Sequence, residues 1–414
     1  MTTTETLLPL SHTVEVESTA ELEDAVRQAY RDRTPLYPIG GGTSLDYGMP
    51  AREPGWGIDL SRHAAIVDYP VRDLTVTVSA GVRWSELQQT LRQNNQELPL
   101  DVPDADRATV GGVVATAWTG PRRLAYGSVR DYVIGIEAVD GRGTRYRGGG
   151  RVVKNVAGYD FCKLLTGSLG TLGVISQVTF RVRPAAEARR WLTMELEDWE
   201  QAWQLACRLR KRPLAAVTMG IVAGPGWATT AWDDQASRTD RLFRFGLLVE
   251  GLEQEVAGAV ESARQAAGGV GQWQEVDQEQ AVEARLAALT AFPASRESPL
   301  IIRAKTVASG AAPFARAVTE LDAAATMFCD LGTGTVDVRF SQFPTQGLSA
   351  TLVRSLQPIA ARYGGHVRLL RNESGGEMTH QVVWSELGLP VELMANVKRA
   401  FDPADLLNRG RFVW

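Results

Sequence analysis

"YPIGGGTSLDYG" (residues 37–48) and "GSLGTLGVISQVTFRV" (residues 167–182) are the two stretches that decide how this chain folds. Residues 40–42 are three consecutive glycines, so the backbone can adopt positive φ there and present successive N–H groups to a pyrophosphate. The hydroxyls of Thr43 and Ser44 add two further donors. For one such loop alone, a plain turn between strands is the simpler interpretation. A second glycine-rich loop in the same half of the chain favours a phosphate-binding cradle.

The surroundings of these glycines argue against two common nucleotide sites. In a Rossmann-type fold the G-x-G-x-x-G motif opens a helix, whereas residues 174–182 alternate β-branched and polar side chains and predict a strand. A P-loop requires Gly-Lys-Ser/Thr after its glycines, and neither loop has that sequence. The pattern therefore disfavours a Rossmann NAD site and ATP or GTP hydrolysis.

Several motifs follow one another in the order expected of a known family. They are "PIGGGTS" (38–44), "TVGGVVATAWTG" (109–120), "AYGSVRDYVIGIEAVDGRG" (125–143) and "NVAGYDFCKLLTGSLGTLGVI" (155–175). Together they resemble the FAD-binding domain of the vanillyl-alcohol oxidase (PCMH-type) family, and the resemblance extends over nearly the whole chain. Within this family, residues 154–174 are most similar to the E-type, FAD-binding subunits of glycolate oxidases. The stretch "FDPADLLNRGRF" (401–412) resembles the usual C-terminal signature.

The resemblance and the sequence patterns together predict an α+β fold with two domains. Residues 1–184 are expected to form a PCMH-type FAD-binding domain of two α+β subdomains, and residues 185–394 an α+β cap with an antiparallel sheet. Residues 395–414 are expected to return to the FAD domain. A chain of 414 residues with 44% hydrophobic content can bury two cores. The predicted cap helix carries side chains at helical spacing, which we interpret as core residues: Trp199, Ala202, Trp203, Ala206 and Leu209.

Composition excludes several classes of protein. A net charge of −4 shows no basic bias, which disfavours nucleic acid as a partner. No apolar run approaches the roughly 20 residues of a membrane-spanning helix, and residues 1–18 lack the features of a signal peptide. We therefore expect a cytoplasmic protein that could associate with a membrane only through partner subunits. Three separated cysteines favour reduced thiols and are too few for a four-cysteine iron–sulfur cluster.

The resemblance also assigns cofactor contacts residue by residue. It assigns the FAD pyrophosphate to Ile39, Gly40, Gly41, Gly42, Thr43 and Ser44, and the flavin and ribityl chain to Thr109, Gly111, Gly112, Ala115 and Thr116. It places around the dinucleotide Gly167, Ser168, Gly170, Thr171, Gly173, Val174 and Ile175. Small residues would let the flat ring approach the backbone, although a strand-entry bulge is the alternative explanation for Gly111 and Gly112. Because Gly42 and Thr43 stand where covalently flavinylated relatives often have histidine, we expect noncovalent FAD.

Catalytic residues are harder to identify. The family's catalytic subunits share a Gly-Asp-Gly-Asn-x-His stretch and a Gly-Glu-His-Gly stretch, and the corresponding places here are "GTGTVD" (332–337) and "LRNESGGE" (370–377). Both histidines are missing.

Oxidising a 2-hydroxy acid needs a base and a cationic group for the carboxylate. The candidate bases are His366 and His380, and the candidate cations are Arg303, Lys305 and Arg339. A partly exposed structural role is the more common explanation for each histidine, and a solvated position on the outer face of a sheet is at least as good an explanation for each cation. No histidine pair has metal-ligand spacing, so no metal site is predicted.

Three functions remain open from the sequence. In the first, the chain is the FAD subunit of a glycolate oxidase or dehydrogenase complex, in which a paralogous flavin subunit oxidises glycolate to glyoxylate and an iron–sulfur subunit carries electrons onward. In the second, it is a self-sufficient FAD-dependent 2-hydroxy acid dehydrogenase that uses His366, His380 or an arginine. In the third, it is a flavin-stabilised structural partner without a redox role. Reduction of its flavin by glycolate, alone or with partners, would distinguish them.

Overall fold

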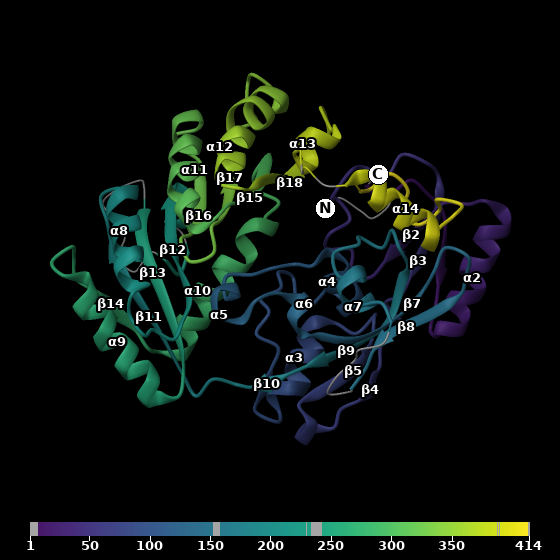
Figure 1. Cartoon of the computed structure of the whole chain (residues 1–414), viewed down its shortest axis with the longest axis horizontal. Coiled ribbons are helices and arrows are strands. Elements are labelled where there is room, and N and C mark those ends of the chain that lie inside the picture. Colours follow the sequence, from purple (N-terminus) through teal and green to yellow (C-terminus); the bar gives the residue numbers. More distant parts are fainter. Residues whose placement is uncertain are drawn as a thin grey trace. The chain divides into compact units, whose positions relative to one another are not determined.

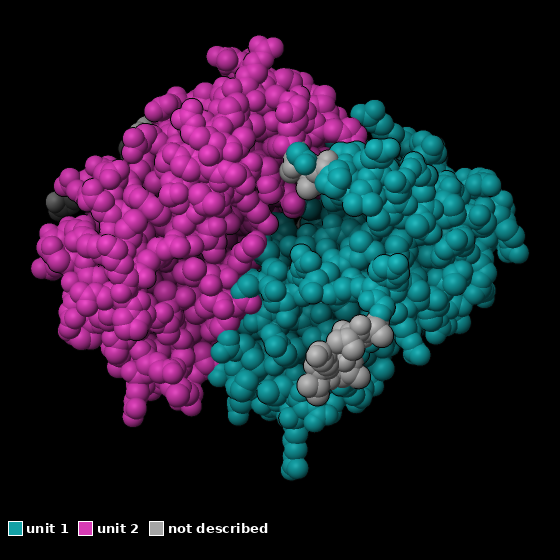
Figure 2. All heavy atoms as spheres, viewed as in Figure 1, with its two compact units in different colours: residues 1–119, 127–185, 388–414 teal, residues 120–126, 186–387 magenta. Residues whose placement is uncertain are grey.

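The computed structural model describes residues 7–151, 158–228, 230–232, 242–386, 388 and 390–412, so residues 155–157 of the fourth motif, and Lys154 before them, lie outside it. The chain divides into two compact units, coloured teal and magenta in Figure 2. Unit 1 comprises residues 1–119, 127–185 and 388–414, and unit 2 comprises residues 120–126 and 186–387. The assignment of residues 120–126 to unit 2 was not expected from the sequence.

Unit 1 is built on two main sheets and a short ribbon (Figure 1). A parallel sheet has the order β1-β3-β2, and an antiparallel sheet has the order β4-β5-β9-β7-β8. The strands are β1 (Leu10–Glu15), β2 (Leu36–Ile39), β3 (Gly55–Asp59), β4 (Ile66–Asp68), β5 (Thr75–Ser79), β7 (Val133–Val139), β8 (Arg145–Gly149) and β9 (Val174–Arg181), with β6 (Gln96–Glu97) and β10 (Arg183–Pro184) forming the ribbon. The strand predicted after the second glycine-rich loop is confirmed as β9.

The helices of unit 1 flank these sheets. They are α2 (Thr19–Asp32), α3 (Trp84–Arg92), α4 (Val110–Thr116), α6 (Val129–Tyr132), α7 (Phe161–Leu165) and α14 (Val391–Phe401). In α3 the side chains of Trp84, Leu87 and Leu91 are buried on one face, as their spacing predicts. Gly111 and Gly112 lie in the first turn of α4, so the alternative of a strand-entry bulge is wrong.

Unit 2 is centred on an antiparallel sheet with the order β14-β11-β13-β12-β16-β17-β15-β18 (Figure 1), which confirms the predicted sheet type. Its strands are β11 (Ala188–Glu195), β12 (Ala216–Gly224), β13 (Leu242–Gly251), β14 (Gln274–Val276), β15 (Leu300–Lys305), β16 (Thr326–Asp330), β17 (Thr335–Arg339) and β18 (His366–Asn372). Its helices are α5 (Arg123–Tyr126), α8 (Trp199–Leu209), α9 (Glu253–Ala267), α10 (Glu279–Ala291), α11 (Ala308–Leu321), α12 (Gln357–Arg362) and α13 (His380–Trp384), together with a π-helix at Ser349–Leu356.

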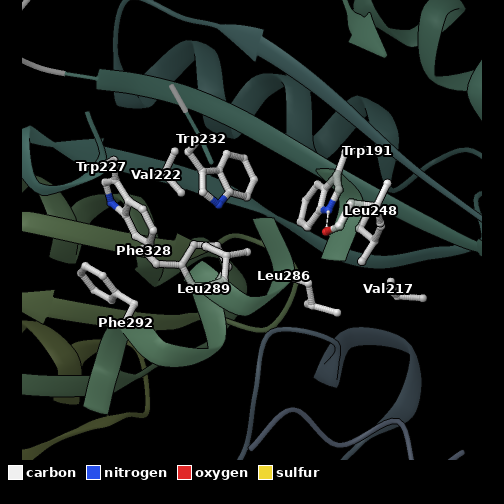
Figure 3. Packing of buried hydrophobic residues seen from close by; sticks show 11 residues of the cluster. Trp191, Val217, Val222, Trp227, Trp232, Leu248, Leu286, Leu289, Phe292 and Phe328 are labelled. Carbon is white, nitrogen blue, oxygen red and sulfur yellow. Dashed lines mark hydrogen bonds between the residues drawn. The ribbon is translucent and has the colours of Figure 1, made fainter. Parts of the chain in front are cut away.

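A tryptophan-rich cluster forms part of the core of unit 2 (Figure 3). The indole of Trp191 on β11 donates a 3.2 Å hydrogen bond to the carbonyl oxygen of Val282 on α10. The ring of Trp227 stacks on Phe292 with 4.6 Å between centroids. The predicted core helix is confirmed as α8, where Trp199 is buried but Trp203 is only half-buried. The hydrogen bond from Trp191 and the burial of Val282, Leu286 and Leu289 in the cluster hold α10 against the sheet.

Three further features of the described residues concern membranes, metals and thiols. Within the ranges given above, no helix has both the length and the apolar character needed to cross a bilayer. No group of three or more His, Cys, Asp or Glu side chains in this part of the chain is arranged to hold a metal ion. Cys162, Cys207 and Cys329 are free thiols, and burial raises the pKa of Cys162 to about 11.

Candidate functional site

A pocket in unit 1 gathers most of the residues predicted to bind FAD. Its walls come from the glycine loop after β2, from the first turns of α4 and from the second glycine loop with the start of β9. The predicted residues that line it are Ile39, Gly40, Gly41, Gly42, Thr43, Ser44, Thr109, Gly111, Gly112, Ala115, Thr116, Gly170, Gly173, Val174 and Ile175. The space among the lining atoms is about 890 Å³, a volume that includes solvent at the open mouth.

At each of the three glycines of the first loop, a larger residue is disfavoured on steric grounds. A Cβ at Gly40 would overlap the hydroxyl oxygen of Thr109, and a Cβ at Gly41 would overlap the carbonyl oxygen of Arg107. Gly42 has φ of 68°, in the left-handed region that favours glycine. The loop therefore packs its backbone directly against the segment that precedes α4, and no side chain fits between them.

The same loop presents unused hydrogen-bond donors to the pocket. Within the described residues, the backbone N–H groups of Gly41, Gly42, Thr43 and Ser44 donate to no acceptor, and the first bonded N–H after them is that of Tyr47, which donates to the carbonyl oxygen of Ser44. Successive free N–H groups in a glycine-rich turn form a concave site for an anion. The arrangement fits a phosphate or pyrophosphate group.

Three residues of the second glycine loop that were predicted to surround the dinucleotide lie outside the pocket lining. Gly167, Ser168 and Thr171 do not line the pocket. The hydroxyl of Thr171 donates a 2.6 Å hydrogen bond to the carbonyl oxygen of Ser168, which makes it a support of the turn. Leu169 and Gly170 both have positive φ, so the turn is tight and brings Gly170 to the pocket wall.

The C-terminal tail supplies pocket residues that sequence reasoning missed. Asn408 and Arg411 both line the pocket. The side-chain amide of Asn408 donates a 2.6 Å hydrogen bond to the carbonyl oxygen of Leu169, and its backbone N–H bonds to Leu36 on β2. The tail therefore touches the strand before the first loop and the turn of the second. The signal that could have found these residues is the C-terminal signature at 401–412. The other missed lining residues are Leu8, Pro38, Leu45, Tyr47, Leu60, Ala80 and Leu169.

The pocket fits FAD on the chemistry of its walls. Free N–H groups and a buried guanidinium at Arg411 suit a pyrophosphate, whereas Leu8, Leu60 and Val174 give apolar surface for flat rings. A Cβ at Gly111 would overlap the Cβ of Ala80, so the first turn of α4 packs its backbone directly against Ala80.

The proposed catalytic arginines of unit 2 are engaged with other groups. The Arg303 guanidinium pairs with both carboxylate oxygens of Asp337, through Nε at 2.6 Å and Nη2 at 2.9 Å, and both side chains are buried. Arg339 donates from Nε to the carbonyl oxygen of Phe292 at 2.7 Å and lies 4.2 Å from the centre of that ring. Both arginines therefore have evident structural functions.

Lys305 lies in a cluster of positive charge on the same sheet. In the strand registers, Lys305 faces His366 and Arg303 faces Arg368, so alternation puts all four side chains on one face. The ammonium of Lys305 has no hydrogen bond or ion pair with any described residue, and burial, assisted by the charges of Arg368, Arg123 and Arg303, lowers its pKa to about 7. Burial and the same positive neighbourhood lower the pKa of His366 to about 4.

The histidine candidates differ in environment. The low pKa of His366 leaves it neutral near pH 7 and makes it a weak proton acceptor. Its Nε2 is buried without a hydrogen-bond partner among the described residues. His380 begins α13 and is exposed. The structure thus brings together His366, Arg303 and Lys305 on one sheet face, whereas His380 stands on a separate helix.

Comparison with known proteins agrees with this site. Residues 10–149 match the family of FAD binding domains. Glycolate oxidase subunit GlcE of Escherichia coli (strain K12) is 36% identical over 193 residues, which are 46% of this chain and 55% of that protein. Glycolate oxidase subunit GlcD of Bacillus subtilis (strain 168) is 30% identical over 208 residues, 50% of this chain and 44% of that protein. The matches thus span about half the length of these relatives.

Solved structures share the fold at low sequence identity. The crystal structure of p-cresol methylhydroxylase with substrate bound has a TM-score of 0.71 and 17% identity, and the superposition covers 96% of this chain and 88% of that one. An alkyldihydroxyacetonephosphate synthase has a TM-score of 0.68 and 15% identity, covering 96% and 76%. These superpositions show the fold that this chain shares with both proteins, and the FAD binding domain matched at residues 10–149 shows FAD as its cofactor.

Proposed function

We propose that the chain is the FAD-binding subunit of a glycolate oxidase or dehydrogenase complex, and that it supports the oxidation of glycolate to glyoxylate. FAD would lie noncovalently in the pocket of unit 1. The observation that carries this proposal is the row of free N–H groups at Gly41, Gly42, Thr43 and Ser44 on the wall of that pocket. The similarity to glycolate oxidase subunits supports the choice of complex.

Different residues of this chain would bind different parts of FAD. When bound, FAD supplies a two-electron acceptor. The loop at residues 40–44 would bind the pyrophosphate through its N–H groups, and the apolar lining residues Leu60 and Val174 would contact the flat ring. The hydroxyls of Thr43 and Thr109 stand on the same pocket wall and would add donors.

A role as a non-catalytic subunit explains why the candidate catalytic side chains of unit 2 are poorly suited to catalysis. Its arginine candidates are engaged with Asp337 and Phe292, and His366 is a weak base. We infer that a paralogous flavin subunit holds glycolate and that an iron–sulfur subunit takes electrons onward. The three cysteines of this chain are too few for a four-cysteine cluster, so such a cluster would lie on another chain. The complex would be cytoplasmic, with any membrane contact made through partners.

The test is anaerobic reduction by glycolate with the flavin of this chain read separately. The chain is loaded with an FAD analogue whose absorption maximum is shifted, mixed with excess glycolate, and then mixed with the partner subunits. We expect no bleaching of the shifted band by glycolate alone and bleaching once the partners are added.

Two other results would overturn this proposal. Bleaching in the isolated chain would make it a dehydrogenase in its own right. A shifted band that never bleaches while the complex turns over would leave the chain as a structural partner whose flavin carries no electrons.

A self-sufficient 2-hydroxy acid dehydrogenase is the second candidate, and Lys305 is the observation that favours it. Lys305 is half-buried and has no ion pair among the described residues, so an anion would stabilise its ammonium, and a carboxylate is the anion that such a substrate offers. With a pKa of about 7, Lys305 would bind a carboxylate at pH 6 and lose its proton above pH 7. Under this function, bleaching by glycolate alone should weaken by up to about tenfold per pH unit above pH 7.

A pair of variants distinguishes this case within the same anaerobic experiment. Lys305→Met should abolish bleaching of the isolated chain, whereas Lys211→Met, at an exposed lysine beyond α8, should leave it unchanged. Equal rates in both variants, or a flat pH profile, would remove Lys305 from the substrate site.

A further inference from the structure

Arg411 is a buried cation on the wall of the FAD pocket. Its side chain is 6% exposed, although it belongs to the last turn of the C-terminal tail. Nη2 donates hydrogen bonds to the carbonyl oxygens of Leu45 and Tyr47, the latter at 3.0 Å. Both acceptors belong to the loop that follows β2, so the guanidinium is held by that loop and lines the same pocket as its free N–H groups.

None of the described residues supplies a counter-ion to this guanidinium. Among the described residues, Nε and Nη1 make no hydrogen bond, and no carboxylate lies within ion-pair distance of the side chain. Asp46 is close enough to favour the charged form but forms no ion pair. Burial lowers the pKa of Arg411 only to about 10, so the group is charged at neutral pH. A buried charge without a partner is costly unless a ligand supplies the opposite charge.

The tail holds Arg411 in this place through several bonds. The backbone N–H of Met49 donates to the carbonyl oxygen of Arg411 at 3.1 Å, and the N–H of Arg411 donates to Asn408. Asn408 in turn bonds to β2 and to the second glycine loop. Arg411 is therefore held in place by hydrogen bonds that connect the tail to the first glycine loop, to β2 and to the second glycine loop.

We propose that Arg411 is a cofactor-binding residue that supplies the positive charge for the phosphate groups of FAD, in the same pocket as the N–H groups of Gly41 and Gly42. The inference rests on the proposed FAD site and adds a contact that the glycine loops do not provide. A guanidinium and a phosphate form charge-assisted hydrogen bonds, which are stronger than those from neutral N–H groups. The C-terminal tail would then be part of the cofactor site and would not only cover it.

The experiment compares binding of FAD with binding of riboflavin, which has the same ring but no phosphate. Apoprotein is titrated with each ligand and the dissociation constant is read from quenching of flavin fluorescence. Arg411→Gln keeps a donor for the carbonyl oxygens of Leu45 and Tyr47 but removes the charge. It should weaken FAD binding by roughly 10- to 100-fold and leave riboflavin binding within about twofold. Arg411→Lys should recover part of the FAD affinity.

Arg409→Gln is the matched control, because Arg409 lies two residues earlier in the tail and forms exposed ion pairs with Glu53 and Asp405. It should change neither affinity. Equal losses of FAD and riboflavin in Arg411→Gln, or no recovery in Arg411→Lys when thermal unfolding shows that the variant is folded, would overturn the role of Arg411. Failure of the unaltered chain to bind FAD would instead contradict the proposed site itself.

Discussion

Gly41→Ala is expected to lower the affinity of the chain for FAD by at least about 100-fold. The new Cβ would overlap the carbonyl oxygen of Arg107 and press on the N–H of Ala108, so the loop at residues 40–44 must move away from the segment before α4. Its N–H groups would then point away from the pyrophosphate. Losing two such hydrogen bonds to a charged group costs roughly 3–6 kcal/mol. Titration of apoprotein with FAD, followed by fluorescence quenching, measures the change.

The control for this substitution is Gly258→Ala. Gly258 lies on an exposed turn of α9, and a Cβ there would meet nothing within 4 Å. The added methyl should raise helix stability by roughly 0.5–1 kcal/mol and leave FAD binding unchanged. If Gly41→Ala bound FAD as tightly as Gly258→Ala does, the first loop would not be the pyrophosphate site.

Lys398→Met is expected to reduce the free energy of unfolding of unit 1 by about 3–5 kcal/mol. Lys398 is 4% exposed, and its Nζ donates to the carbonyl oxygens of Thr171 and Leu407, each at 2.9 Å, and to the carboxylate of Asp402 at 2.6 Å. Without the ammonium, the carboxylate of Asp402 stays buried and uncompensated. Because these bonds connect the tail to the second glycine loop, FAD should also be released at a lower urea concentration than from the unaltered chain. A urea titration that follows flavin fluorescence reports both effects.

Two further variants test whether burial is the cause. Lys163→Met removes an exposed pair with Asp160 and should cost no more than about 1 kcal/mol. In the double variant with Lys398→Met and Asp402→Asn, no buried charge is left, so it should be more stable than Lys398→Met alone. An unchanged urea midpoint for Lys398→Met would show that the tail is not anchored through this residue.

Local sequence signals predicted much of the fold of this chain, because they act within one element. The alternation of residues 174–181 indicated β9, and the spacing of Trp84, Leu87 and Leu91 indicated α3. The three glycines of the first loop were also recognisable, since only a close backbone approach or positive φ requires glycine at successive positions. Most residues that the resemblance assigned to FAD line one pocket, and their contacts with FAD stay a prediction.

What the sequence did not reveal depends on contacts between distant parts of the chain. Arg411 bonds to the carbonyl oxygen of Leu45, 366 residues earlier, and no local pattern encodes that pairing. The resemblance placed Thr171 around the dinucleotide, and its hydroxyl bonds to the carbonyl oxygen of Ser168 within its own turn. Likewise Arg303 looked available for a substrate carboxylate until its pairing with Asp337 on the neighbouring strand was seen. Satisfied and unsatisfied polar groups are distinguished only by tertiary structure.

The measurement that most directly tests the central claim is the flavin content of the purified chain before and after denaturation. The chain is saturated with FAD and freed of excess, its visible spectrum is recorded, and the protein is then precipitated with acid. The account predicts close to one FAD per chain, all of it released into the supernatant, because the pocket holds the pyrophosphate through N–H groups and a guanidinium without a covalent bond. A chain that retains no flavin, or a flavin that stays with the precipitate, would contradict it.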